Sequence, residues 1–215
     1  MSNTNYKLIS YCAVRRVIGF LGILLPIVLF FNSSYCSLPL EKSISAYYYS
    51  NLGDVFVAIL IALAMFLFSY RGYEEQLDNW ITNIAALAAI GVAFFPCNGV
   101  EKLCVICNHI RLSKETYTTI HYISASIFFI SLSILLLVYF TKSDKKDKAD
   151  KTEEKRLRNM IYRGCGAIMV ICLLIIAAFK FFNLGNERIF WPESVALFAF
   201  GFAWLVKGEL LLGDK

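Results

Sequence analysis

The sequence is poor in charged residues. Aspartate, glutamate, lysine and arginine make up 17% of its 215 residues, whereas soluble domains carry about 25%. Hydrophobic residues account for 58%, against about 45–50% in soluble domains, and they fall in blocks separated by short polar stretches. This pattern is typical of a chain that passes repeatedly between water and lipid. It argues against a soluble helical protein, because six such blocks leave too few polar faces to cover a globule.

Histidine is scarcer still, with only His109 and His121 in the chain. A zinc site built from three histidines of one chain is therefore excluded, and we predict no metal and no cofactor. The chain also lacks an internal repeat and a matched pair of broken helices, which argues against a transporter. No clear small-x-small cleavage site follows the first apolar block, so a cleaved signal peptide is not expected.

Six blocks of apolar residues predict six membrane-spanning segments. They cover residues 17–31, 55–70, 80–96, 120–140, 161–182 and 190–206. Only helices and closed barrels satisfy their backbone polar groups in lipid, and barrel strands would alternate at a period of two, whereas these blocks are continuous. The sequence therefore predicts an all-α polytopic membrane protein, a bundle of six transmembrane helices that forms a single domain over residues 1–215.

The basic residues predict the orientation of the bundle, because cytoplasmic flanks are enriched in lysine and arginine. With the N-terminus inside, 15 of the 21 basic residues lie on the inner side, so both termini are expected in the cytoplasm. Most of this bias comes from the charged cytoplasmic loop 142–158, which also supplies most of the net charge of +5. We therefore predict no nucleic-acid partner.

The alternating charges of loop 142–158 favour a solvated loop or a helical extension of the fifth span. Two alternatives remain open for this segment. It could be a patch for anionic lipid head groups, or a docking segment for a cytoplasmic protein partner.

Seven cysteines are present, and their positions divide them into two groups. Cys12, Cys165 and Cys172 lie in or near the inner halves of spans, where free cysteine behaves as a small apolar residue. The others fall in outer loops, where thiols oxidise; they are Cys36, Cys97, Cys104 and Cys107. We predict at least one disulfide among these four. The spacing of the last three, followed by His109, also matches a zinc site, and unpaired thiols are a third interpretation.

Three ionisable residues open the even-numbered spans at their outer ends: Asp54, His121 and Glu193. Each alone would be a helix cap or a first-turn charge, but polar groups within a membrane point to function. If these spans pack together, their side chains line an outward-opening cavity in which His121 lies close to Asp54 or Glu193. Lys180 could meet an anionic group there. The predicted ligand-binding residues are Asp54, His121, Ser124, Glu193, Tyr48 and Arg188.

Three short segments carry a resemblance to a known family: Ser43–Ala46 in the first outer loop, Ile120–Ala125 and Glu193–Phe202. Through them the chain resembles the FRAG/DRAM/SFK family of six-span membrane proteins and related bacterial membrane proteins of unknown function. The resemblance implies six spans with both termini in the cytoplasm, which agrees with the charge count. It also implies lipid-linked roles, such as GPI-anchor lipid remodelling, phosphoinositide-kinase anchoring and autophagy. A weaker likeness is to the CREST hydrolases, whose three-histidine metal site this chain cannot form.

Three functions are compatible with these features. The first is binding of a lipid or amphiphile in the outward-facing polar cavity, with membrane lipids as partners. The second is a membrane-embedded lipid hydrolase or acyl-transfer enzyme that uses His121 with Asp54 or Glu193. The third is a membrane scaffold that recruits a cytoplasmic partner through loop 142–158. The sequence leaves open whether the protein is an enzyme.

Overall fold

The computed structural model describes residues 3–35, 39–71, 76–97, 113–142, 153–182 and 189–211, and these residues form a helical bundle. Its elements are α1 (Asn3–Tyr35), the 3-10 helix η1 (Ile44–Tyr49), α2 (Gly53–Ser69), α3 (Gln76–Phe94), α4 (Lys114–Ile134), the π-helical turn η3 (Leu135–Tyr139), α5 (Glu153–Phe181) and α6 (Phe190–Lys207). The all-α prediction is confirmed for this part of the chain.

Length and apolar character identify candidate membrane spans among these helices. Four of the described segments are long and apolar enough to cross a membrane: Tyr11–Tyr35, Leu77–Phe94, Glu115–Tyr139 and Glu153–Phe181. The helix Gly53–Ser69 is equally apolar in character but shorter. The described chain is therefore a helical bundle of the kind that membranes contain.

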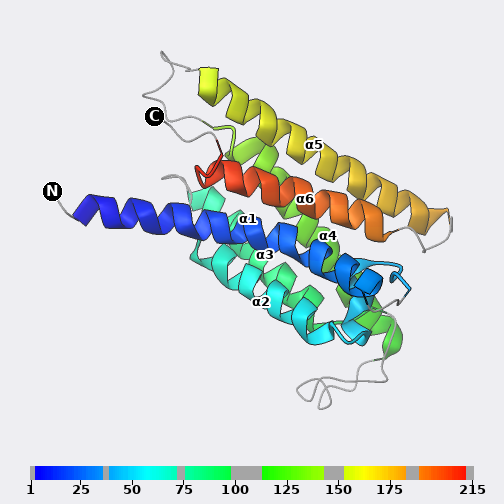
Figure 1. The fold of residues 1–215 in the computed structure, drawn as a ribbon. Coiled ribbons are helices and arrows are strands. Elements are labelled where there is room, and N and C mark those ends of the chain that lie inside the picture. The colour runs from blue at the N-terminus through cyan, green and yellow to red at the C-terminus, as the bar shows by residue number, and fades with distance from the viewer. Residues whose placement is uncertain are drawn as a thin grey trace.

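Successive helices run in opposite directions, so the start of α1 and the end of α6 lie at the same end of the bundle (Figure 1). A hydrogen bond joins them there, since Arg16 Nε donates to the carbonyl oxygen of Gly208 at 2.8 Å. The 3-10 helix η1 lies at the opposite end, and we call that end the η1 end. There the segment before η1 meets the first residue of α6, because Phe190 N donates to the Lys42 carbonyl oxygen at 2.9 Å.

The helices form a ring that closes unevenly. Going round it, α4 packs on α3, α3 on α2, α2 on α1, α1 on α6 and α6 on α5. The remaining pair, α4 and α5, is in much sparser contact than α5 and α6. We call this boundary the α4–α5 seam. Backbone atoms come close together between α1 and α6, where a Cβ added to Gly201 would lie 2.6 Å from the Gly19 carbonyl oxygen.

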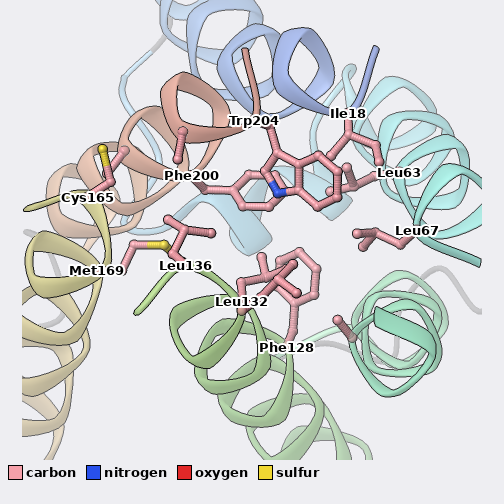
Figure 2. Close-up of a cluster of buried hydrophobic side chains, with 14 of the residues drawn as sticks. Ile18, Leu63, Leu67, Phe128, Leu132, Leu136, Cys165, Met169, Phe200 and Trp204 are labelled. Atoms are coloured by element: carbon pink, nitrogen blue, oxygen red, sulfur yellow. The ribbon is translucent and has the colours of Figure 1, made fainter. Parts of the chain in front are cut away.

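The main hydrophobic core lies in the half of the bundle nearer the termini. Trp204 of α6 is fully buried at its centre, and Figure 2 shows its indole between Ile18 of α1, Leu63 of α2 and Leu132 of α4. Three aromatic rings surround it, with centroid distances of 4.9 Å to Tyr70, 5.1 Å to Phe140 and 6.0 Å to Phe200. Edge-to-face pairs of this kind add about 0.5–1.5 kcal/mol each beyond their burial.

The C-terminal part of the charged segment 142–158 forms a helical extension of the fifth span, one of the two structures that its charge pattern favours. Helix α5 already begins at Glu153, with two acidic residues in its first turn, Glu153 and Glu154. Glutamate, lysine, arginine and leucine are good helix formers, and acidic residues favour a helix N-terminus, so the segment from 153 to 158 continues the fifth helix. Residues 143–152 lie outside the described part of the chain.

Candidate functional site

A cavity of about 820 Å³ lies along the α4–α5 seam. Its walls come from α4, α5, the start of α6 and the segment Glu41–Ala46 that leads into η1. The volume is within the range of about 300–1,000 Å³ that small-molecule sites occupy. The cavity forms at the boundary where α4 and α5 are in sparse contact.

The two parts of this cavity differ in chemistry. At the η1 end it is lined by polar side chains: Glu41, Lys42, Ser43, Ser45, Cys97, His121, Tyr122, Lys180 and Glu193. Toward the termini the lining becomes mainly apolar, with Phe129, Ile130, Ile134 and Leu137 on the α4 side and Val170, Leu173, Leu174 and Ala177 on α5. A polar end that continues into a long apolar wall matches the shape of an amphiphile.

The side of the cavity along the seam is open to the surroundings of the bundle. Ile130 on α4 and Leu174 on α5 line the cavity and are nevertheless 50% and 64% exposed. The groove ends where the two helices meet again, because a Cβ on Gly166 of α5 would lie 2.5 Å from Cγ of Leu137. Leu137 belongs to the π-helical turn η3, and such turns frequently occur at functional sites.

His121 is a buried side chain that lines the polar end of the cavity. Its Nδ1 lies 2.8 Å from the carbonyl oxygen of Phe95, at the end of α3. A carbonyl only accepts hydrogen bonds, so Nδ1 must carry the proton, and in the neutral ring Nε2 keeps a lone pair. The contact fixes the tautomer and orientation of the imidazole.

Glu193 also lines the cavity, and it connects α6 to the loop before η1. Its Oε2 accepts a hydrogen bond of 2.6 Å from the backbone N–H of Ile44. The position in the first turn of α6 favours a carboxylate as well. A further bond of 2.5 Å between Ser33 and Tyr47 holds η1 against α1. Glu193 therefore shapes the polar end of the cavity by fixing the segment that covers it.

Cys97 contributes a buried thiol to the same region, three residues beyond the end of α3. Its sulfur lies 3.3 Å from Oγ of Ser45, and Ser45 in turn lies 3.2 Å from Oγ of Ser43. Burial raises the pKa of the Cys97 thiol, and this effect outweighs the hydrogen bond from Ser45, which lowers it. The thiol is therefore a poor nucleophile at neutral pH, since the thiolate is the reactive form.

Lys180 and Tyr122 join α5 to α4 across the mouth of the cavity. The ammonium group of Lys180 donates to the Tyr122 hydroxyl at 2.5 Å and lies 4.2 Å from the centroid of the same ring. Both side chains are exposed. The interaction places a positive charge at the polar end of the cavity, on the side of the seam.

The structure brings His121 and Glu193 into one cavity and places Asp54, Tyr48 and Ser124 outside its lining. Asp54 is exposed at the start of α2 and does not line the cavity. The cause is its neighbour: Gly53 is buried against the backbone of Tyr48, and with Phe56 it defines the inward face of α2. Tyr48 packs edge-on against Tyr49 and lines no part of the cavity.

Ser124 lies on a face of α4 that turns toward α3, where its side chain contacts Gly91. Phe128, one turn further along this face of α4, is buried in the core. The cavity face lies beside it, through Ala125 and Phe129. Arg188 lies outside the described residues.

The cavity was expected between the second, fourth and sixth helices, and a small cavity does lie there. It measures about 40 Å³ and is lined by Phe56 and Leu60 of α2 together with His121 and Glu193. The large cavity instead has α5 as a wall. Sequence reasoning missed this wall, although Val170, Leu173, Ala177 and Lys180 follow helical spacing along one face of α5.

The outer-loop cysteines are only partly described. Cys97 carries a free thiol, while Cys36, Cys104 and Cys107 lie outside the described residues together with His109. Within the described part of the chain, no group of three or more histidine, cysteine, aspartate or glutamate side chains could hold a metal ion.

Comparison with known proteins adds a family to this description. Residues 24–208 match the model of a family of unknown function, DUF7103. No curated protein and no solved structure matches the chain. Because the matched region covers well over half of the chain, from the C-terminal third of α1 through the end of α6, the chain belongs to this family of unknown function.

Proposed function

We propose that this chain is an integral membrane protein with six spans and both termini in the cytoplasm, and that its outward-facing cavity binds a lipid or amphiphile. The observation that supports this most directly is the 820 Å³ cavity with one polar end and a long apolar wall. The charge count puts the η1 end, which carries the polar part of the cavity, on the outer side of the membrane.

The six-span topology rests on the four long apolar helices and on the antiparallel order of all six. Helix α2 is apolar over its whole length although it is short. Helix α6 packs between α1 and α5, so it lies inside the same bundle. An even number of antiparallel spans returns the C-terminus to the side of the N-terminus.

The experiment that tests binding is photo-crosslinking in phosphatidylcholine nanodiscs, with a hexadecyl probe that carries a diazirine in its chain. Crosslinks should concentrate on the cavity-lining peptides of α4 and α5. Ala177→Trp places an indole in the groove and should lower this labelling about tenfold or more. Ala167→Trp is the matched control, because Ala167 is an exposed alanine of the same helix that does not line the cavity.

Labelling spread evenly over the lipid-facing helices, and equal in both tryptophan variants, would contradict the proposal. Thermal unfolding of both variants checks that each remains folded.

A second candidate is a membrane-embedded lipid hydrolase or acyl-transfer enzyme with His121 as the base. The observation that favours it is the fixed tautomer of His121 beside the cavity, because an unprotonated Nε2 can accept a proton. Product formation from a lipid ester, lost in His121→Ala, would support this candidate. Turnover that is equal in the wild type and the variant would exclude His121 as the base.

We also infer a disulfide on the outer side, among Cys36, Cys104 and Cys107. Thiols there face an oxidising environment, and loss of such a bond typically costs about 2–5 kcal/mol. Alkylation without reductant, followed by intact mass measurement, should show two of these three cysteines protected. The relation to the FRAG/DRAM/SFK family and the recruitment of a cytoplasmic partner stay predictions.

A further inference from the structure

We propose that the ligand of the α4–α5 cavity carries an anionic head group, a carboxylate or a phosphate, and that Lys180 binds it. This inference rests on the proposed function, since it names the class of amphiphile that the cavity takes. It starts from the place where the charged side chain of Lys180 reaches across the mouth of the cavity, from α5 to α4.

The present partner of the Lys180 ammonium group is neutral. It donates to a phenol hydroxyl and lies over the same aromatic ring. The ammonium group is charged with either partner, but an anionic oxygen adds an attraction between opposite charges that the neutral phenol oxygen does not offer. An anionic head group can therefore replace the Tyr122 hydroxyl with a gain in free energy, and the exposed position of both side chains allows the exchange.

The other charges at the polar end are compatible with an anion. Glu193 is the acidic side chain deepest in the cavity, and its carboxylate is already bound by the Ile44 N–H in the first turn of α6. Glu41 and Lys42 are neighbours at the rim and bring one charge of each sign. Lys180 is thus the charge of the cavity whose hydrogen-bond partner a ligand can replace.

The apolar wall cannot provide the selectivity. A lipid chain that moves from the bilayer into an apolar groove exchanges one apolar environment for another, so it gains little from the hydrophobic effect. Ile130 and Leu174 are both exposed along the open side of the groove, so a chain can pass sideways from the surrounding lipid. Discrimination between ligands must then come from the head group and from Lys180.

The test compares three probes that share a hexadecyl chain with a diazirine: hexadecanoate, hexadecyl phosphate and hexadecanol. Each is titrated into phosphatidylcholine nanodiscs that contain the full chain, and crosslinking to α4 and α5 is quantified. The anionic probes should label the wild type at lower concentrations than hexadecanol does. Lys180→Gln should weaken labelling by the anionic probes about tenfold to a hundredfold, the usual effect of a hydrogen bond to a charged group, and should leave hexadecanol unchanged.

Lys142→Gln is the matched control. Lys142 also lies over a tyrosine ring, 4.6 Å from the centroid of Tyr139, but at the opposite end of α4 and away from the cavity. Its replacement should change the concentration of each probe that is needed for labelling by no more than about twofold, because surface charge pairs contribute little.

The outcomes separate this inference from the proposed function. If hexadecanol labels the cavity as strongly as the anionic probes, or if Lys180→Gln has no effect, the inference about the head group is wrong while cavity binding stands. If Ala177→Trp leaves crosslinking by all three probes unchanged, the labelling does not depend on the groove and the proposed function itself fails. Preference for hexadecanoate or for hexadecyl phosphate identifies which anion Lys180 binds.

Discussion

At the scale of single residues, Cys97 shows how the fold controls reactivity. The thiol is buried beside Ser45 at the polar end of the cavity, and burial raises its pKa above the ordinary value for cysteine. In the folded protein, the thiolate fraction of Cys97 should therefore start to rise only at a higher pH than in an unfolded peptide.

We accordingly predict that maleimide alkylation of Cys97 is slow at pH 7 and that its rate keeps increasing above pH 9. Ser45→Ala should not make the thiol more reactive, because the lost hydrogen bond had lowered the pKa. Peptide mapping of the alkylated protein over a range of pH measures the rate for this one cysteine. A rate at neutral pH equal to that of a free peptide thiol would show that Cys97 is not buried as described.

Of the three ionisable residues that open predicted spans, two line the cavity and one does not. His121 and Glu193 opened predicted spans, and both face the cavity. Asp54 opened a span in the same way, yet it faces outward, because the adjacent Gly53 takes the buried position against Tyr48. One residue changes the direction of a helical side chain by about 100°. The position of Asp54 at the start of a span predicts its level along α2, but it does not predict the side of α2 on which the residue lies.

At the scale of elements, the contact between α1 and α6 depends on glycine. A Cβ added to Gly19 would lie 2.8 Å from the Gly201 carbonyl oxygen, and one added to Gly201 would lie 2.6 Å from that of Gly19. Small residues allow helix backbones to approach this closely, which is a common way for helices to pack in membranes.

We predict that Gly201→Ala lowers the free energy of unfolding by about 1–3 kcal/mol, the usual cost of overpacking. Gly164→Ala is the control, since a Cβ at Gly164 on α5 meets nothing within 4 Å. That variant should unfold like the wild type or be slightly more stable, because alanine is the better helix former. Unfolding in detergent micelles, followed by circular dichroism, compares the two. Equal stability of both variants would mean that α1 and α6 are further apart.

The helices themselves could be predicted because each is an almost continuous apolar block. Which helices pack against each other could not be predicted in this way. The ring order and the sparse α4–α5 seam depend on which small residues meet, as where Gly166 of α5 meets Leu137 of η3. The 3-10 helix η1 was also missed, since its six residues carry no periodic pattern long enough to identify it.

At the scale of the whole molecule, the proposed topology has a direct test. Single cysteines at Ser143 and Asn98, both outside the described residues, follow α4 and α3 at opposite ends of the bundle. In intact cells, a membrane-impermeant maleimide should label the cysteine at position 98 and not the one at position 143. The reverse pattern would invert the bundle and place the polar end of the cavity in the cytoplasm.

The helices also differ in length across the bundle. Helix α2 has 17 residues and α3 has 19, while α5 has 29. At 1.5 Å per residue, α2 spans about 26 Å, which is shorter than the roughly 30 Å hydrocarbon core of a typical bilayer. In the proposed topology, lipid beside α2 and α3 must become thinner or the bundle must tilt, at a cost of fractions of a kcal/mol per Å. We therefore expect the protein to prefer thin membranes. We also expect short-chain lipids to gather along the α2–α3 side.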